Sequence, residues 1–245
     1  DREKSEGIKA ATEIFPRTWT SGGSAANTIH GLAMLGADTG FIGSIGRDDI
    51  GDFFENDMKK AGVNTLLIRR NSPTGTAIAL ITDDSERTFA THLGAATELD
   101  AEDLKPLLFE GYDILYLEGY IINNFPLVET ACSIAHSKNM LVALDLASYN
   151  VVEEHLGSFR KIVSGYVDIL FANEQEAKAF TGLDATQALQ ALSAISSTVI
   201  LKIGAEGSWL KTVDETVKIS AYTVKCVDTT GAGDLYAAGF LYGCA

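Results

Sequence analysis

A carboxylate placed directly behind a glycine-rich turn is the clearest chemical feature of the sequence. The stretch Asp228-Thr-Thr-Gly-Ala-Gly-Asp234 precedes a run of small and apolar residues suited to a packed helix. Glycines at 231 and 233 allow a tight turn whose backbone N–H groups are not covered by side chains. If a helix begins there, those N–H groups lack helical partners, and together with the helix dipole they form an anion site.

An anion site beside a carboxylate suits phosphoryl transfer to an alcohol. Asp234 would accept the hydroxyl proton, while the N–H groups stabilise the charge on the moving phosphoryl group. A positioned general base is worth roughly 10²–10⁴ in rate. The alternative is a structural turn in which Asp234 only interacts favourably with the helix dipole. A G-x-G-D fragment alone leaves both interpretations open.

A second loop of small residues lies near the start of the chain. It reads Ser21-Gly-Gly-Ser-Ala-Ala-Asn27 and is followed by Phe41-Ile-Gly-Ser-Ile-Gly-Arg-Asp-Asp-Ile-Gly51. In this order, the two loops resemble the N-terminal and C-terminal signatures of the ribokinase-like (PfkB) family of carbohydrate and nucleoside kinases. The stretches Glu86–Ala96 and Tyr116–Tyr120 look more like the adenosine-kinase-like branch than like ribokinase itself.

This resemblance implies catalytic and substrate roles for the two loops. It makes Asp234 the general base, and the anion hole is then the backbone of Gly231, Ala232 and Gly233. It also implies that the substrate is bound by four residues, Gly22, Gly23, Asn27 and Glu118. The alternatives are a turn that starts a helix for the two glycines, a helical surface residue for the asparagine, and a plain strand-end acid for the glutamate.

The same resemblance implies a site for ATP with Mg²⁺. The residues that would contact the nucleotide are Asn173, Lys202, Gly204 and Gly207. Glu176 would organise Mg²⁺ through water, since magnesium usually keeps several of its waters. Asp228 and Thr230 match positions where many members bind K⁺. An Asn-x-x-Glu stretch is also typical of a helix cap, and Lys202, where members often have threonine, could instead point to solvent.

Alternating strands and helices must position these loops. From residue 114 onward, short apolar strands alternate with helices, and repeated β-α-β units predict a mainly parallel central sheet flanked by helices. Ligands in such folds bind beyond the carboxyl ends of the strands. Residues 65–93 are short, partly alternating segments around turn signals, which predict an antiparallel β excursion. We expect an α/β, ribokinase-like fold with a kinase core at 1–64 and 94–245 and a small β-sheet lid at 65–93.

The composition restricts the partners. The formal net charge is −14, which argues against binding nucleic acid or an anionic membrane by bulk electrostatics. The three cysteines, Cys132, Cys226 and Cys244, are far apart and fit a reducing compartment, so we expect a cytoplasmic protein. No apolar run approaches the roughly 18 residues of a membrane span. The resemblance adds a homodimer formed through the lid as an expectation.

We therefore expect an ATP-dependent phosphotransferase that phosphorylates a hydroxyl, in particular a CH₂OH group, of a small sugar or a nucleoside. The sequence favours a nucleoside and a simple sugar about equally as the acceptor, and it favours a sugar phosphate less. The alternative is a non-catalytic sensor of the same fold that binds a nucleoside or sugar. Family segments that supply an N-terminal substrate aspartate and the adenine pocket have no counterpart before Gly22 or after the last helix.

Overall fold

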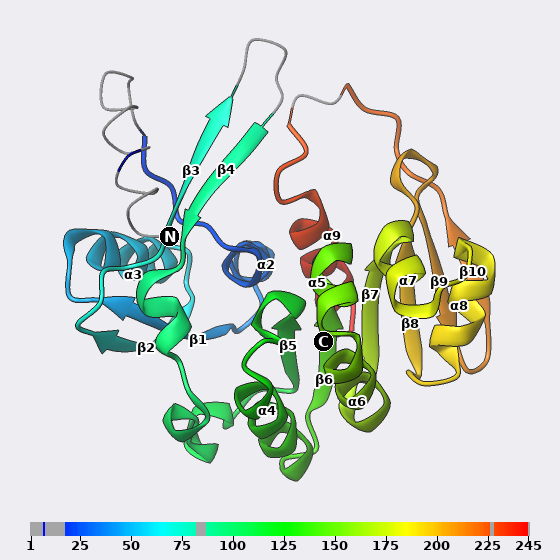
Figure 1. Cartoon of the computed structure of the whole chain (residues 1–245), viewed down its shortest axis with the longest axis horizontal. Coiled ribbons are helices and arrows are strands. Elements are labelled where there is room, and N and C mark those ends of the chain that lie inside the picture. Colours follow the sequence, from blue (N-terminus) through cyan, green and yellow to red (C-terminus); the bar gives the residue numbers. More distant parts are fainter. Residues whose placement is uncertain (1–6, 8–17, 82–86, 226–227, 245) are drawn as a thin grey trace. The chain divides into compact units, whose positions relative to one another are not determined.

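The strand and helix alternation predicted from the sequence is present in the computed structural model. The structure describes residue 7 and residues 18–81, 87–225 and 228–244. The chain divides into an N-terminal unit, residues 1–99, and a C-terminal unit, residues 100–245. Figure 1 shows the elements of each unit, coloured along the chain.

The N-terminal unit is built around a parallel strand pair. Its elements are α2 (Ser24–Met34), β1 (Gly40–Gly46), α3 (Asp49–Lys60) and β2 (Asn64–Arg70). β1 and β2 pair in parallel from Gly40↔Asn64 to Gly46↔Arg70, and α3 provides the crossover between them. Helix α3 begins where the Asp48 side chain accepts the Gly51 N–H. Ala26, Met58 and Val63 form the buried centre of this unit.

A β-hairpin follows the parallel pair. β3 (Thr76–Ile81) and β4 (Arg87–His92) are antiparallel, as predicted for the excursion, and residues 82–86 between them lie outside the described residues. The prediction was wrong for β2, because this strand pairs in parallel with β1 rather than with the hairpin. An apolar run such as Leu66-Leu-Ile68 does not by itself reveal the direction of its partner strand.

The C-terminal unit is centred on a six-stranded sheet in the order β10-β9-β8-β7-β6-β5. The strands are β5 (Ile114–Glu118), β6 (Leu141–Asp145), β7 (Ile169–Asn173), β8 (Thr198–Lys202), β9 (Ser208–Thr212) and β10 (Thr216–Ile219). β5 to β8 are parallel, whereas β9 and β10 add an antiparallel edge. The mainly parallel sheet predicted from the β-α-β pattern is therefore confirmed.

The helices of this unit lie between the strands of the sheet in sequence or after its last strand. They are α4 (Phe125–Ser137), α5 (Tyr149–Glu154), α6 (Leu156–Tyr166), α7 (Glu174–Thr181), α8 (Ala185–Ser193) and α9 (Ala232–Tyr242). α9 packs against β7 through Phe240, whose ring lies edge-on to Phe171 at 5.4 Å between centroids. Among the described residues, no helix is long and apolar enough to cross a membrane.

Candidate active site at the carboxyl edge of the six-stranded sheet

Each of the four parallel strands ends in a polar residue. The apolar runs ILYLE, LVALD, ILFAN and TVILK close with Glu118, Asp145, Asn173 and Lys202. The register pairs Glu118 with Asp145 and Asn173 with Lys202, while Asp145 pairs with Phe171, two residues before Asn173. The four residues therefore lie at the same edge of the sheet. The carboxyl edge of a parallel sheet is where ligands bind in such folds.

Lys202 and Asp145 form an ion pair across this edge. The Lys202 Nζ atom lies 2.6 Å from Asp145 Oδ2, and the two side chains are only 18% and 6% exposed. Burial lowers the pKa of Lys202, but the charge and hydrogen bond of Asp145 outweigh it, so the pKa is raised overall. The alternative in which Lys202 points to solvent is therefore wrong for this structure.

Glu118 is a buried carboxyl group rather than a plain strand-end acid. The Tyr116 hydroxyl donates to Glu118 Oε1 at 2.5 Å, and the residue is almost fully buried. Burial first, and then the nearby Asp145 carboxylate, raise the pKa of Glu118 to about 8, and Asp234 acts in the same direction. A carboxyl group with this pKa is protonated at neutral pH and can donate a hydrogen bond.

Asn173 and Glu176 form a reciprocal cap at the start of α7. The Asn173 Oδ1 atom accepts the Glu176 N–H at 2.9 Å, and Glu176 Oε2 accepts the Asn173 N–H at 2.7 Å. Asn173 Nδ2 also donates to Glu176 Oε1 at 2.6 Å. Burial and the Asp145 charge raise the pKa of Glu176 despite these bonds. The capping interpretation of this Asn-x-x-Glu stretch is thus confirmed, and the nucleotide and magnesium roles stay predictions.

The glycine-rich turn begins α9 as predicted. Gly231 is the N-cap residue with φ of 74°, a conformation that favours glycine. The Leu235 N–H donates to the Gly231 carbonyl, which is the first hydrogen bond of the helix. The Ala232 N–H donates to the Thr229 carbonyl at 3.0 Å, so this amide is engaged within the turn. A Cβ atom built on Gly233 would lie 3.6 Å from Lys202 Nζ. The turn that carries Asp234 therefore lies beside the Lys202 ammonium group.

The loop after β8 needs glycine for packing reasons. Gly204 and Gly207 have φ of 58° and 99°. A Cβ atom on Gly207 would lie 1.9 Å from the Ile219 carbonyl oxygen, which no side chain could tolerate. The Ser208 hydroxyl lies 2.7 Å from the Tyr236 hydroxyl and ties this loop to α9. The nucleotide role of both glycines stays a prediction, since packing alone explains Gly207.

The remaining predicted positions lie at the start of α2 and in the segment before α9. Gly23 is the N-cap residue of α2 with φ of 104°, and the Asn27 N–H donates to its carbonyl, so the two-glycine stretch does start a helix. Gly22 has open space around its Cβ position. In the C-terminal unit, Asp228 Oδ1 accepts the Thr230 N–H at 2.7 Å. Substrate contacts and a K⁺ site at these positions stay predictions.

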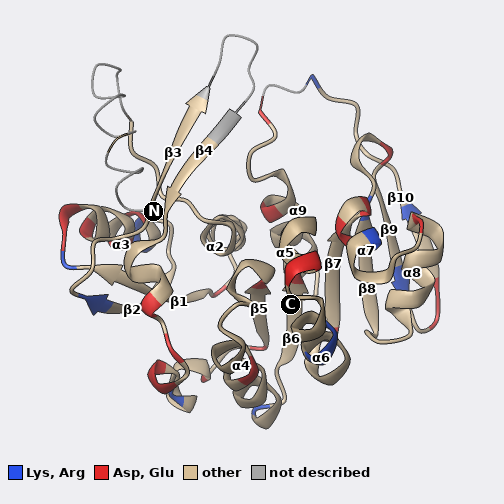
Figure 2. Cartoon of the chain, viewed as in Figure 1, with Lys and Arg blue, Asp and Glu red and all other residues tan. Residues whose placement is uncertain are grey.

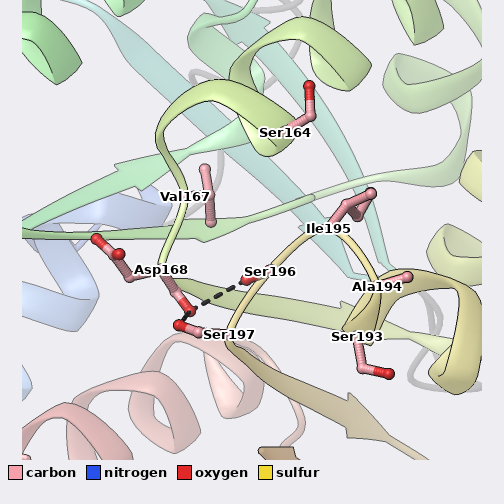
Figure 3. Close-up of a pocket in the computed structure, with 8 residues that line it drawn as sticks. All are labelled: Ser164, Val167, Asp168, Ser193, Ala194, Ile195, Ser196 and Ser197. Atoms are coloured by element: carbon pink, nitrogen blue, oxygen red, sulfur yellow. Dashed lines mark hydrogen bonds between the residues drawn. The ribbon is translucent and has the colours of Figure 1, made fainter. Parts of the chain in front are cut away.

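The opposite, amino edge of the sheet carries a hollow of about 510 Å³. Figure 3 shows the residues that line it, among which both Ser196 and Ser197 donate to the Asp168 carbonyl. The Asp168 carboxylate accepts the Val142 N–H at 2.8 Å. These polar groups bond to the backbone around them, and they include no buried charge. The hollow is therefore a weaker candidate site than the carboxyl edge.

The charge distribution fits a ligand held by local groups. Figure 2 shows acidic residues on helices and loops of both units, and the chain has 33 acidic and 19 basic residues. Among the described residues, no three His, Cys, Asp or Glu side chains are grouped to hold a metal ion. Magnesium that keeps its waters and binds mainly through phosphate oxygens does not need such a group.

Sequence reasoning missed Asp145 and Tyr116. Asp145 belongs to no recognised motif, yet LVALD is a buried apolar strand that ends in an acid, as ILYLE is. Parallel strands place their carboxyl ends at one edge. The strand-end pattern could therefore have identified Asp145 as a neighbour of Glu118 and Lys202.

Comparison with known proteins identifies the family of the chain. A model of the pfkB family of carbohydrate kinases matches residues 11–245. An uncharacterized sugar kinase from Archaeoglobus fulgidus is 30% identical over 219 residues, covering 87% of this chain and 85% of the relative. A ribokinase from Staphylococcus aureus is 28% identical over 233 residues, which are 90% of this chain and 73% of the relative.

A solved structure extends the likeness to the fold. The adenosine kinase from Sinorhizobium meliloti matches with a TM-score of 0.91 and 32% identity, covering 100% of this chain and 76% of that one. The fold is thus the ribokinase-like α/β fold predicted from the sequence. The chain belongs to the pfkB family of carbohydrate kinases and is a sugar or nucleoside kinase.

Proposed function

We propose that the protein transfers the terminal phosphoryl group of ATP to a hydroxyl, in particular a CH₂OH group, of a small sugar or nucleoside. The observation that carries this proposal is the position of the turn at the start of α9. Its Gly233 lies beside the Lys202 ammonium group, which brings a cation to the glycine-rich start of a helix. A cation and the N–H groups at a helix start are donors of the kind that phosphoryl transfer requires.

Asp234 acts as the general base in this proposal. Its carboxylate accepts the proton of the acceptor hydroxyl as that oxygen bonds to the terminal phosphorus and the bond to the ADP oxygen breaks. Asp234 is in the first turn of α9, directly after the Gly231–Gly233 stretch whose backbone N–H groups we assign to the anion hole. A base of this kind is worth roughly 10²–10⁴ in rate.

The anion hole is the backbone of Gly231, Ala232 and Gly233. The Ala232 N–H donates to Thr229 in the described conformation, so its use requires that this turn bond is exchanged for one to the phosphoryl oxygen. The absence of side chains at 231 and 233 leaves room for a close approach. Asn173, Lys202, Gly204 and Gly207 are the residues we assign to the nucleotide.

The chemistry of the residues at this edge fits Mg²⁺ held through water. Glu176 is a buried carboxyl group with Asp145 as a charged neighbour, and such groups can orient waters of the ion. When bound, Mg²⁺ would neutralise charge on the phosphate oxygens. K⁺ at Asp228 and Thr230 is a separate hypothesis, which a comparison of turnover in KCl and NaCl would test.

Gly22, Gly23, Asn27 and Glu118 are the residues we assign to the acceptor. The neutral form of Glu118 can donate a hydrogen bond to a hydroxyl oxygen, which a carboxylate cannot do. The β3–β4 hairpin would act as a lid that excludes water from the reaction. Pairing of two lids in a homodimer is a separate expectation, which a solution mass of one chain at micromolar concentration would contradict.

The test is acceptor-dependent ADP release with ATP and Mg²⁺. Adenosine, ribose, a hexose and a hexose phosphate represent the acceptor classes, and Asp214→Asn in the exposed β9–β10 turn is the matched control for Asp234→Asn. We expect release with one class, retained in the control and lost in Asp234→Asn. Binding of an acceptor without ADP release in the wild-type protein would instead support the ligand-sensor alternative.

A further inference from the structure

Lys202 is a cation surrounded by carboxyl groups from several elements. Asp145 of β6 lies at 2.6 Å, and Glu176 of α7 and Glu118 of β5 also raise the pKa of the lysine. Asp234 of α9 acts on the same group of residues through its effect on Glu118. This edge therefore carries an excess of acidic groups around one identified ammonium group.

A buried ion pair of this kind needs a reason beyond stability. Removing two charges from water costs several kcal/mol per ion, and replacing such a pair by apolar residues is often neutral or stabilising. The strands that carry the pair are otherwise apolar runs, LVALD and TVILK, into which apolar ends would fit. The Lys202 Nζ atom also lies beside Gly233 of the glycine-rich turn, at 3.6 Å from its Cβ position.

We propose that Asp145 is a positioning residue that holds the Lys202 ammonium group against the glycine-rich turn, where Lys202 binds the terminal phosphate of ATP. This inference rests on the proposed function and deepens it. An ammonium group has three donors, of which Asp145 occupies one, so the others can serve phosphate oxygens. Without this cation, the Asp145 carboxylate would repel a triphosphate.

The inference predicts that Lys202 distinguishes triphosphate from diphosphate. The experiment measures binding of a non-hydrolysable ATP analogue and of ADP by calorimetry, without an acceptor. We expect Lys202→Met to lower the affinity for the analogue by about 10- to 100-fold, which is the effect of one charge-assisted hydrogen bond. The affinity for ADP should change far less. Lys202→Arg should recover part of the loss. Lys138→Met, which removes the surface partner of Glu110, is the matched control and should leave both affinities unchanged.

The Asp145 variants test positioning. Asp145→Asn keeps the lysine but removes the charge that holds it, so we expect an intermediate loss of analogue affinity and a lower kcat with little change in the KM of the acceptor. Asp145→Glu should recover part of that loss. A purely structural role would not produce a loss that is selective for the triphosphate.

A double variant separates function from folding. Lys202→Met with Asp145→Asn leaves no unpaired charge from the pair, so it should regain the stability that the single lysine variant loses. We expect the double variant to keep the loss of analogue binding. Wild-type analogue affinity in the double variant, or an equal loss of ADP binding in Lys202→Met, would overturn the inference.

The outcomes also separate this inference from the proposed function. The protein could bind the analogue more tightly than ADP through Lys202 and yet phosphorylate no acceptor. That result would support the inference and contradict the proposed function. Undiminished turnover and analogue affinity in Lys202→Met would contradict the inference and leave the proposed function in place.

Discussion

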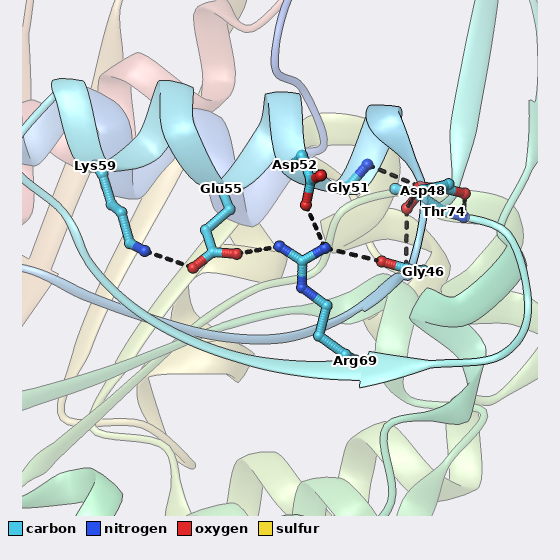
Figure 4. A network of polar contacts seen from close by, with 8 residues as sticks. All are labelled: Gly46, Asp48, Gly51, Asp52, Glu55, Lys59, Arg69 and Thr74. Atoms are coloured by element: carbon cyan, nitrogen blue, oxygen red, sulfur yellow. Dashed lines mark hydrogen bonds and ion pairs between the residues drawn. The ribbon is translucent and has the colours of Figure 1, made fainter.

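The two units of the protein each contain a cluster of charged side chains, and the clusters differ in balance and burial. In the N-terminal unit, Arg69 of β2 contacts Asp52 and Glu55 of α3, and Lys59 contacts Glu55 at 2.5 Å (Figure 4). Two cations there face two carboxylates, and Asp52 and Lys59 are largely exposed. In the C-terminal unit, Lys202 and Asp145 are buried next to Glu118 and Glu176.

The same residue type responds in opposite ways in the two clusters. Hydrogen bonds from Lys59 and Arg69 lower the pKa of Glu55, whereas burial and Asp145 raise the pKa of Glu118 to about 8. The N-terminal cluster satisfies its charges and holds α3 against β2. The C-terminal cluster leaves acidic groups short of cations, which suits a site completed by a ligand.

The largest expected effect on stability comes from breaking the buried pair. Lys202→Met leaves Asp145 buried without its partner, so we expect the free energy of unfolding to fall by about 3–5 kcal/mol. Urea unfolding followed by Trp209 fluorescence measures this, because Trp209 lies in β9 of the same unit. Replacing Trp19 by Phe makes Trp209 the single reporter, since the chain has two tryptophans.

The pH dependence of stability should have opposite signs for two matched Glu→Gln variants. Folded Glu118 stays protonated up to about pH 8, while its unfolded form ionises above its ordinary pKa of 4.5. Stability from Glu118 is therefore present below pH 4.5 and is lost as the pH rises to about 8. Glu118→Gln should gain stability relative to the wild type across that window, by roughly 2–4 kcal/mol.

Glu55→Gln is the counterpart in the N-terminal cluster. The folded pKa of Glu55 lies below 4.5, so its stabilisation is present above that pH and is lost as the pH falls through the folded pKa. Glu55→Gln should therefore be less stable than the wild type at neutral pH and approach it in acid. If the stability of the two variants relative to the wild type changed with pH in the same direction, the proposed difference between the clusters would be contradicted.

The N-terminal cluster should tolerate the loss of its central cation better than the C-terminal one. Arg69 is 28% exposed, and water can replace its contacts, so we expect Arg69→Met to lower the free energy of unfolding by about 1 kcal/mol. A variant with Trp209→Phe leaves Trp19, which packs edge-on against Phe53 of α3, as the reporter of this unit. If Arg69→Met lowered the free energy of unfolding as much as Lys202→Met does, the difference in side-chain exposure would not explain the difference between the clusters.

The smallest effect is expected at Lys59. Its side chain is 55% exposed and forms an i,i+4 pair with Glu55 on α3. Such pairs contribute about 0.3–0.5 kcal/mol, and salt screens them. Lys59→Met should therefore change the urea midpoint only slightly, and the change should disappear in high salt.

The sequence predicted most elements because each carries a local signal. Gly62 ends α3 with φ of 90°, and the turn at Gly231 starts α9, since both need a backbone conformation that glycine adopts readily. Strands β5 to β8 are short apolar runs between helical patterns. The partner of β2 was not predicted, because pairing depends on a strand distant in sequence rather than on the residues of β2.

The candidate site was predicted only in part for the same reason. Asp234 and Gly231 lie in one contiguous string, so the motif located them. Asp145 contacts Lys202 across 57 residues of sequence, and only the folded sheet brings the two together. The turn bond between Ala232 and Thr229 likewise follows from backbone geometry that residue types do not specify.

The central claim is that Asp234 and the turn beside Lys202 carry out phosphoryl transfer. The most direct measurement compares wild type and Asp234→Asn for binding of the ATP analogue and for turnover with the acceptor that the wild type uses. We expect similar binding and a kcat lowered by roughly 10²–10⁴ in the variant. Turnover by Asp234→Asn within about threefold of the wild type, far less than a general base contributes, would contradict the central claim.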